Sequence, residues 1–251
     1  MTLKILSLNL FEGGILWDNI VTFLHKEQPD ILCLQEVIDG SADQPTHFQS
    51  ITRLKKVLPD FHYFFSPELY EVSSKGEGDI GNAIFSRFPL SNQQTIFLNG
   101  KYQKVNRPED KEDFSTDPKN LQSCLVTVAE KSIHVLNLHG IWGLDGGDNP
   151  DRLEMSEKII GVIRDKLSLV LMGDFNVRPD TQTIRNIEKH LVNVFKDELT
   201  TSFNMRHKTN PGYATAVVDM FFATSDLTIV SHCCPDDDVS DHKPLVVMIE
   251  M

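Results

Sequence analysis

The chain has 251 residues, of which 40% are hydrophobic and 24% charged, so it can build a substantial core. Its formal net charge of −12 counts against tight, nonspecific binding to duplex nucleic acid, because such binding relies on clustered Lys and Arg. No secretory signal pattern opens the chain, and no apolar run approaches the roughly 20 residues that span a bilayer. We therefore expect a soluble, cytoplasmic protein with no membrane span and no obligate protein partner.

Strands and helices alternate in the first part of the chain. Apolar side chains recur at helical spacing over 15–27, and this stripe stops before Pro29. The apolar run 31–34 suits a central strand that is covered on both faces. In chain order, the predicted elements here are a strand over 3–10, a helix over 15–27, a strand over 31–34, a helix over 46–57 and strands over 61–65 and 83–85.

Two polar segments in this region are predicted as loops. Residues 71–79 form a polar, Gly-containing loop, and 99–120, rich in Lys, Glu, Asp and Pro, form a long surface loop. Residues 76–81 match G-x-G-x-x-G, but a dinucleotide fingerprint needs a preceding strand and a following helix. A strand-like apolar run follows here, so we interpret the match as part of a flexible loop.

Strand patterns resume after residue 120 and continue to the end of the chain. In order, we predict a hairpin of strands over 121–128 and 133–138, a loop over 140–150, a helix over 151–166, a strand over 169–172, a short helix over 181–190 and strands over 217–222, 227–230 and 245–249. Early strand–helix alternation followed by hairpin-like strands fits β-sheets packed face to face with helices outside.

Several polar residues fall at the ends of predicted strands, where function usually resides. They are Asn9, Glu36, Asn82, His139, Asp174, Asn176, Asp219, Asp241 and His242. Each has an ordinary structural explanation when taken alone. Asp219 is the exception, because a carboxylate within so apolar a strand needs a partner such as a histidine. Asp174 and Asn176 are two residues apart, so their side chains point to one side if the chain there is extended.

Other residues near these positions are weaker candidates. Trp142 is equally suited to stacking on a ring of the substrate and to anchoring the surface loop. Arg178 and the run 206–208 are candidates for contacts to a non-scissile phosphate, although solvated surface charge is the default for both. Arg152 opens a predicted helix and is expected to be only structural.

Four ordered motifs resemble those of the endonuclease/exonuclease/phosphatase superfamily. They are residues 28–36 (Gln-Pro-Asp-Ile-Leu-Cys-Leu-Gln-Glu), 81–87 (Gly-Asn-Ala-Ile-Phe-Ser-Arg), 173–176 (Gly-Asp-Phe-Asn) and 240–244 (Ser-Asp-His-Lys-Pro). The resemblance covers essentially the whole chain and implies one domain over 1–251. It implies an α/β, four-layer sandwich in which two packed mixed β-sheets carry helices on both outer faces. It also implies a hydrolase that acts on phosphate esters with Mg²⁺ or Mn²⁺.

The resemblance assigns metal and substrate contacts to particular residues. Glu36 would be the principal metal ligand, with Asp241 close to the metal. Asn9, Asn82 and His139 would contact the scissile phosphate. Oxygen ligands suit Mg²⁺, which takes few protein carboxylates and completes its shell with waters and substrate oxygens.

The resemblance also implies the catalytic groups. Asp174 and Asn176 would position and activate the attacking water, and Asn176 would also contact substrate. His242, oriented by Asp219, would stabilise the phosphorane-like transition state or serve in acid–base chemistry. The sequence leaves open whether Asp174 or His242 is the base.

Two positions depart from the apurinic-endonuclease branch of the superfamily. That branch and the tyrosyl-DNA phosphodiesterase branch usually have Asp two residues after the first Asn, whereas this chain has Phe11 there, with Glu12 beside it. The apurinic-endonuclease branch also tends to have Tyr at the position of His139, where His is more similar to the deoxyribonuclease, sphingomyelinase and phosphatase branches. Both departures disfavour a dedicated abasic-site enzyme, and Phe11 also puts a second acidic metal ligand in doubt.

Three functional hypotheses follow. The leading one is a metal-dependent phosphodiesterase or nuclease that hydrolyses a P–O bond by in-line attack of an activated water, with nucleic acid among the candidate substrates. The alternative is a phosphomonoesterase or phospholipid-type phosphodiesterase on the same scaffold. A catalytically silent interaction module is disfavoured, because the full set of motif residues is present.

Overall fold

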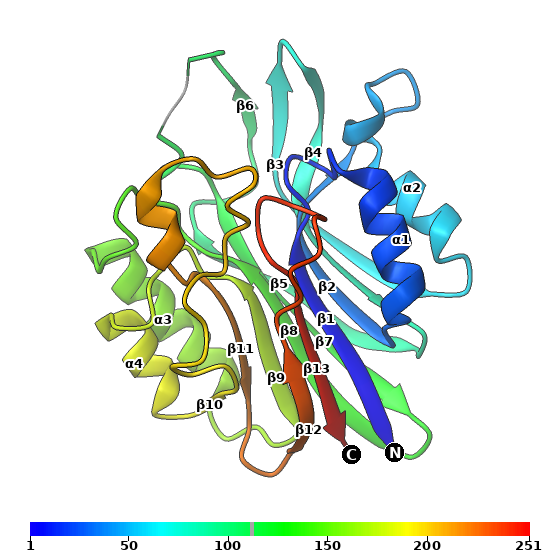
Figure 1. Ribbon diagram of the computed structural model, residues 1–251, viewed down its shortest axis with the longest axis vertical. Coiled ribbons are helices and arrows are strands. Elements are labelled where there is room, and N and C mark those ends of the chain that lie inside the picture. The colour runs from blue at the N-terminus through cyan, green and yellow to red at the C-terminus, as the bar shows by residue number, and fades with distance from the viewer. Residues whose placement is uncertain (111–112) are drawn as a thin grey trace.

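Two mixed β-sheets form the centre of the computed structural model, which describes residues 1–110 and 113–251 (Figure 1). The strands of the seven-stranded sheet are, in spatial order, β12 (Thr228–Cys233), β13 (Leu245–Glu250), β1 (Thr2–Asn9), β2 (Ile31–Asp39), β4 (Gly76–Ser86), β3 (His62–Ser73) and β6 (Lys104–Asn106). Those of the six-stranded sheet are β10 (Val192–Asn193), β11 (Asp219–Ala223), β9 (Leu169–Asp174), β8 (Lys131–His139), β7 (Lys119–Val128) and β5 (Leu90–Asn99).

Helices cover the outer face of each sheet, which confirms the predicted four-layer sandwich (Figure 1). The helices are α1 (Trp17–Glu27), α2 (Ser50–Val57), α3 (Pro150–Ile163) and α4 (Gln182–Glu188), with 3-10 turns η1 (Thr46–Phe48) and η2 (Pro211–Thr215). The first pair packs on the seven-stranded sheet and the second pair on the six-stranded sheet. None of the helices in the described part of the chain has the length and apolar character needed to cross a membrane.

The run 31–34 shows how the sequence produces this layering. Ile31 and Cys33 pack into the core between the two sheets, and Leu32 and Leu34 pack under α1 and α2. All four side chains are almost completely buried. Successive side chains of a strand point to opposite faces, so a strand covered on both faces must be continuously apolar.

Local signals define where the helices begin and end. The α1 helix buries its apolar stripe and ends at Gln28, whose left-handed conformation (φ 48°) lets its N–H bond the Leu24 carbonyl at 2.9 Å. Pro29 follows and cannot continue the helix. The α3 helix begins after Asn149, whose side chain accepts a hydrogen bond from the Arg152 N–H at 2.9 Å, with Pro150 at the first helical position.

The predicted loop over 71–79 was wrong. Strands β3 and β4 continue through it as a hairpin in which Ser73 pairs with Gly76. This hairpin extends past the packed layers, so its side chains have no core to face and its sequence shows no apolar alternation. The predicted loop over 99–120 contains strand β6, and its residues 111–112 lie outside the described residues.

Candidate active site

The register of the six-stranded sheet places three of the predicted residues side by side on neighbouring strands. In the parallel pair β8–β9, His139 lies opposite Asp174, and in the antiparallel pair β9–β11, Asp219 lies opposite the same Asp174. All three side chains are buried. Neighbouring strands are about 4.8 Å apart, so the register alone places both residues next to Asp174.

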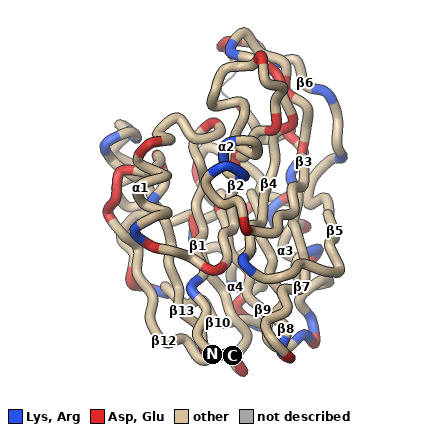
Figure 2. The backbone as a smooth tube through the Cα atoms, turned by 90° about the vertical axis from the view of Figure 1, so that its right-hand side faces the viewer, with Lys and Arg blue, Asp and Glu red and all other residues tan. Residues whose placement is uncertain are grey.

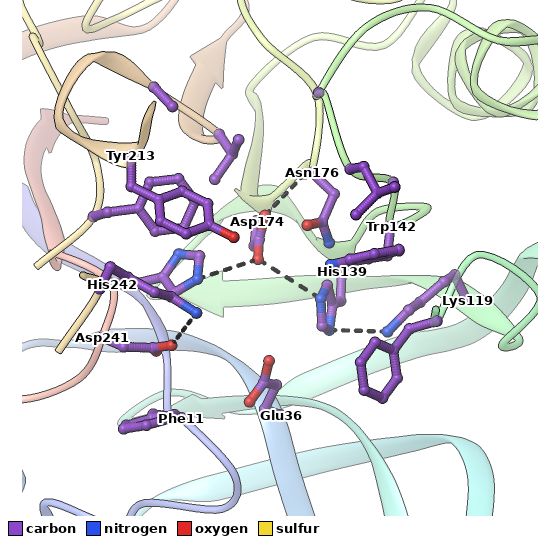
Figure 3. Close-up of a pocket in the computed structure, with 18 of the residues that line it drawn as sticks. Phe11, Glu36, Lys119, His139, Trp142, Asp174, Asn176, Tyr213, Asp241 and His242 are labelled. Carbon is purple, nitrogen blue, oxygen red and sulfur yellow. Dashed lines mark hydrogen bonds and ion pairs between the residues drawn. The ribbon is translucent and has the colours of Figure 1, made fainter. Parts of the chain in front are cut away.

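His242 joins this row from the segment before β13. Its Nδ1 donates to Asp219 Oδ2 at 2.8 Å, which confirms the expectation that Asp219 has a histidine partner. Its Nε2 lies 3.8 Å from Asp174 Oδ2, and His139 Nε2 lies 3.6 Å from the same oxygen (Figure 3). Two imidazoles therefore approach one carboxylate oxygen from either side.

Burial and charge give these groups different protonation behaviour. Burial raises the pKa of Asp174 to about 7, with His242 acting against this effect. Burial opposes protonation of His242, but the charges of Asp219 and Asp174 outweigh it and raise its pKa to about 10. Burial lowers the pKa of His139 well below its ordinary value. At neutral pH, His242 is charged and His139 neutral, and Asp174 has a pKa that suits a general base.

The chain turns sharply after Asp174, so the condition of an extended chain is not met there. Asn176 adopts a left-handed conformation (φ 54°), and its N–H donates to Asp174 Oδ1 at 2.8 Å. The Asn176 side-chain amide donates to the Gly140 carbonyl at 3.2 Å. This turn presents both side chains at the cleft without strand alternation.

Arg152 fixes the loop next to this turn. Its buried guanidinium donates to the Asn176 carbonyl at 2.7 Å and to the Ile141 carbonyl at 3.0 Å. The same guanidinium also donates hydrogen bonds to the carbonyls of Gly143 and Gly147. The prediction of a structural role is consistent with these contacts, which tie the loop after His139 to the loop after Asp174.

Glu36 approaches from the other sheet. A bulge between Leu34 and Val37 interrupts the pairing of β2 with β4, and Glu36 has a left-handed conformation there (φ 53°). Its Oε1 accepts from Asn9 Nδ2 at 3.0 Å, and the same amide lies 3.3 Å from Asp174 Oδ2. Figure 3 shows the Glu36 carboxylate pointing into the space below Asp174.

The donors on this side fit a hard divalent cation. Glu36 and Asp241 offer carboxylate oxygens, and such a small set leaves room for waters and substrate oxygens. Asp241 Oδ2 is also paired with Lys208 Nζ at 2.6 Å.

A second acidic and histidine group, Asp174, Asp219 and His242, has ligand atoms within 4.8 Å of one another and could hold a metal ion. Its members already share the 2.8 Å bond between His242 and Asp219. Glu36, the metal ligand expected from the sequence, is not a member of this group.

The structure places Asn82 behind the cleft. It is fully buried, and its amide donates to Glu68 Oε1 at 3.2 Å and to Asn120 Oδ1 at 3.1 Å. Glu68 and Lys119 line the cleft in front of it, and neither was predicted from the sequence. Single charged residues in strands resemble ordinary surface residues, so only the pairing of distant strands reveals them.

The cleft around these residues has a volume of about 1470 Å³. Among the residues that line it, Asp and Glu outnumber Lys and Arg. In the view of Figure 2, basic and acidic positions are interspersed along the described backbone. Trp142 lies beside His139 and Tyr213 lies beside His242, so aromatic rings flank the two histidines (Figure 3).

Comparison with known proteins agrees with the geometry. The model of the Endonuclease/Exonuclease/phosphatase family matches residues 7–242, and the chain therefore belongs to this family. The matched segment includes every candidate residue from Asn9 to His242. Comparison with curated proteins gave no match.

Solved structures of the family share the fold at low sequence identity. An endonuclease/exonuclease/phosphatase from Beutenbergia cavernae DSM 12333 is 18% identical with a TM-score of 0.74, covering 100% of this chain and 72% of that one. A mannosyl-6-phosphatase from Bacteroides thetaiotaomicron VPI-5482 is 19% identical with a TM-score of 0.73, covering 99% and 100%. The human Nocturnin catalytic domain with bound sulfate is 17% identical with a TM-score of 0.68, covering 99% and 94%.

Proposed function

We propose that residues 1–251 form one domain that hydrolyses a phosphate ester by in-line attack of water, with a divalent metal ion as cofactor. The observation that carries this proposal is the convergence on Asp174 Oδ2 of His139, His242 and Asn9, with Glu36 hydrogen-bonded to the same Asn9 amide. A general base, donors for phosphate oxygens and a metal ligand therefore lie within one small space.

Each residue has a defined task in this proposal. Asp174 accepts the proton of the attacking water, and Asn176 holds that water in line with the P–O bond. The charged His242, oriented by Asp219, stabilises the negative charge of the phosphorane-like transition state. His139 donates to a phosphate oxygen.

Mg²⁺ or Mn²⁺ bound by Glu36, with Asp241 nearby, would polarise the phosphate and neutralise its charge.

The charge of the cleft favours a small substrate with few negative charges beyond the scissile phosphate. The charged His242 faces the reacting centre, whereas Lys119 and Lys208 are each paired with a carboxylate, so the positive charge there suits a single phosphate group. The excess of Asp and Glu over the whole lining disfavours a long polyanion. This observation moves the phosphomonoesterase hypothesis ahead of the nuclease hypothesis.

A phosphodiester, including a short single-stranded nucleic acid, is the second candidate. The half-buried Trp142 next to His139 supports it, because a base can stack on an exposed aromatic face. The two candidate substrates differ in how many negative charges they carry outside the scissile phosphate group.

The test is hydrolysis of an aryl phosphomonoester, an aryl phosphodiester and a short oligonucleotide with Mg²⁺ or Mn²⁺. We expect turnover that is lost with EDTA and in Asp174→Asn, and that is fastest on the monoester. Faster oligonucleotide cleavage would favour the nuclease hypothesis. If Mn²⁺ raises the melting temperature but none of the three substrates is turned over, the interaction-module hypothesis gains support.

A further inference from the structure

A buried ionic network lies behind His139. Lys119 Nζ is 3.2 Å from His139 Nδ1 and 3.2 Å from Glu68 Oε2. Lys119 is only 8% exposed and Glu68 only 1%, so solvent barely reaches either charge. The network connects β3, β7 and β8, which belong to both sheets.

The contacts of Glu68 favour its ionised form. Its Oε1 accepts from Asn82 Nδ2 at 3.2 Å and from the Asn120 N–H at 3.3 Å, and its Oε2 faces the Lys119 ammonium. Burial raises the pKa of Glu68, but every one of these partners is a donor, so a protonated carboxyl would have no acceptor among them. The carboxylate in turn keeps Lys119 charged, because an unpaired buried carboxylate is costly.

An ammonium group has three donors and no acceptor. The His139 Nδ1 that faces it must therefore present a lone pair. We propose that Lys119, held by Glu68, fixes His139 as a neutral imidazole whose proton is on Nε2. Burial and the Lys119 charge both lower the pKa of His139, in agreement with this state.

The fixed tautomer directs a donor into the cleft. His139 Nε2 faces Asp174 Oδ2 at 3.6 Å, on the side where the phosphate is expected. His242 has the opposite arrangement, because its Nδ1 donates to the Asp219 carboxylate. One ring is thus a neutral hydrogen-bond donor and the other a cation. Lys119 is a positioning residue in this scheme. The effect on catalysis rests on the proposed function. The tautomer of His139 is independent of that function.

The experiment is long-range ¹H–¹⁵N NMR of the histidine rings in the full chain at pH 7, with His139→Gln to assign the signals. We expect a protonated Nε2 and an unprotonated Nδ1 for His139. A proton on Nδ1, or a charged ring, would overturn the proposal. The tautomer is read from the wild-type chain without substrate, and His139→Gln serves only to assign the signals, so the outcome is independent of the proposed function.

Variants of Lys119 test the cause of the tautomer. Lys119→Met removes the donor, so we expect a mixture of tautomers and a kcat lower by on the order of tenfold, with a smaller change in KM. Lys119→Arg keeps a donor and should keep the single tautomer. Lys131→Met, an exposed position in the β7–β8 turn region, is the matched control and should change neither. An unchanged tautomer in Lys119→Met would contradict the role of Lys119.

Discussion

The two sheets contribute to the site in different ways. The six-stranded sheet aligns His139, Asp174 and Asp219 across three neighbouring strands through regular pairing. The seven-stranded sheet presents Glu36 from a bulge, beside a loop in which all four residues from Phe11 to Gly14 have positive φ. The half that carries the proposed general base is therefore built largely from regular strand pairing, and the half that carries the proposed metal ligand from irregular structure.

The irregular backbone has a clear use. The Glu12 N–H donates to Glu36 Oε2 at 2.7 Å, and the Gly13 N–H donates to the Glu36 carbonyl at 3.0 Å. A non-glycine residue at positive φ costs on the order of 1 kcal/mol. Holding the Glu36 carboxylate in place therefore introduces backbone strain in the bulge and in the loop beside it. We expect changes in the regular half to appear in the rate and changes in the irregular half to appear in metal affinity and stability.

The largest effect is expected for Asp174→Asn. This change removes the general base but keeps the shape, so kcat should fall by roughly 10³- to 10⁴-fold. Stabilisation by Mn²⁺, measured as a shift in melting temperature, should persist. Loss of that stabilisation would show that Asp174 is a metal ligand. The division into one half for catalysis and one half for metal binding would then be wrong.

Glu36→Gln should act mainly on the metal. Removing the negative oxygen should weaken Mn²⁺ binding by about 10- to 100-fold, and excess metal should restore most of the activity. Isothermal titration with Mn²⁺ and activity against metal concentration measure both effects. An unchanged affinity would show that the ion binds elsewhere.

Asp219→Asn should act through His242. Loss of the carboxylate removes the main effect that raises the pKa of this ring to about 10, so its pKa should fall and kcat should drop about 10²-fold. In the wild type, the stabilisation from the charged ring is full below about pH 6.5 and is lost as pH rises towards 10. The stability difference between wild type and variant should therefore shrink between pH 7 and 10, as measured by urea unfolding.

Gly13→Ala should reduce stability without touching the catalytic half. Gly13 has a φ of +76°, and an added Cβ would lie 2.0 Å from the His47 carbonyl oxygen. We expect a loss of about 2–3 kcal/mol in the free energy of unfolding. Gly161→Ala in α3 is the control, since its Cβ meets nothing within 4 Å, and it should stabilise by about 0.5–1 kcal/mol.

The smallest effect is expected for Trp142→Ala. The ring flanks the site without hydrogen-bonding any reacting group, so KM should rise a few-fold while kcat stays nearly constant. Steady-state kinetics on the preferred ester measure both constants. A large fall in kcat would mean that the loop, and not only the ring, was disturbed.

The sequence was most informative where strands end. Apolar runs located β8, β9 and β11, and the polar residues His139 and Asp174 that close two of them meet in the structure. Asp219 was expected to have a histidine partner because of its apolar strand, and His242 provides it.

Long-range pairing and unusual backbone were beyond the reach of local patterns. Glu68 and Lys119 are separated by 51 positions, and nothing in either segment indicates that they meet. The turn at Asn176 depends on a left-handed conformation of this residue, and no adjacent glycine indicates such a conformation in the sequence. The β3–β4 hairpin carries no core-facing alternation, so its segment resembled a loop.

The pairing of β1 with β13 also determines where the chain ends meet. The Met251 N–H bonds the Met1 carbonyl at 2.9 Å, so both ends lie together, and Figure 1 shows them at the lower edge of the sandwich. Asn9, at the other end of β1, is eight residues away, or about 26 Å along the strand. A short peptide could therefore join the ends into a cyclic or circularly permuted protein, and an immobilisation tag at either end would leave the cleft facing solvent.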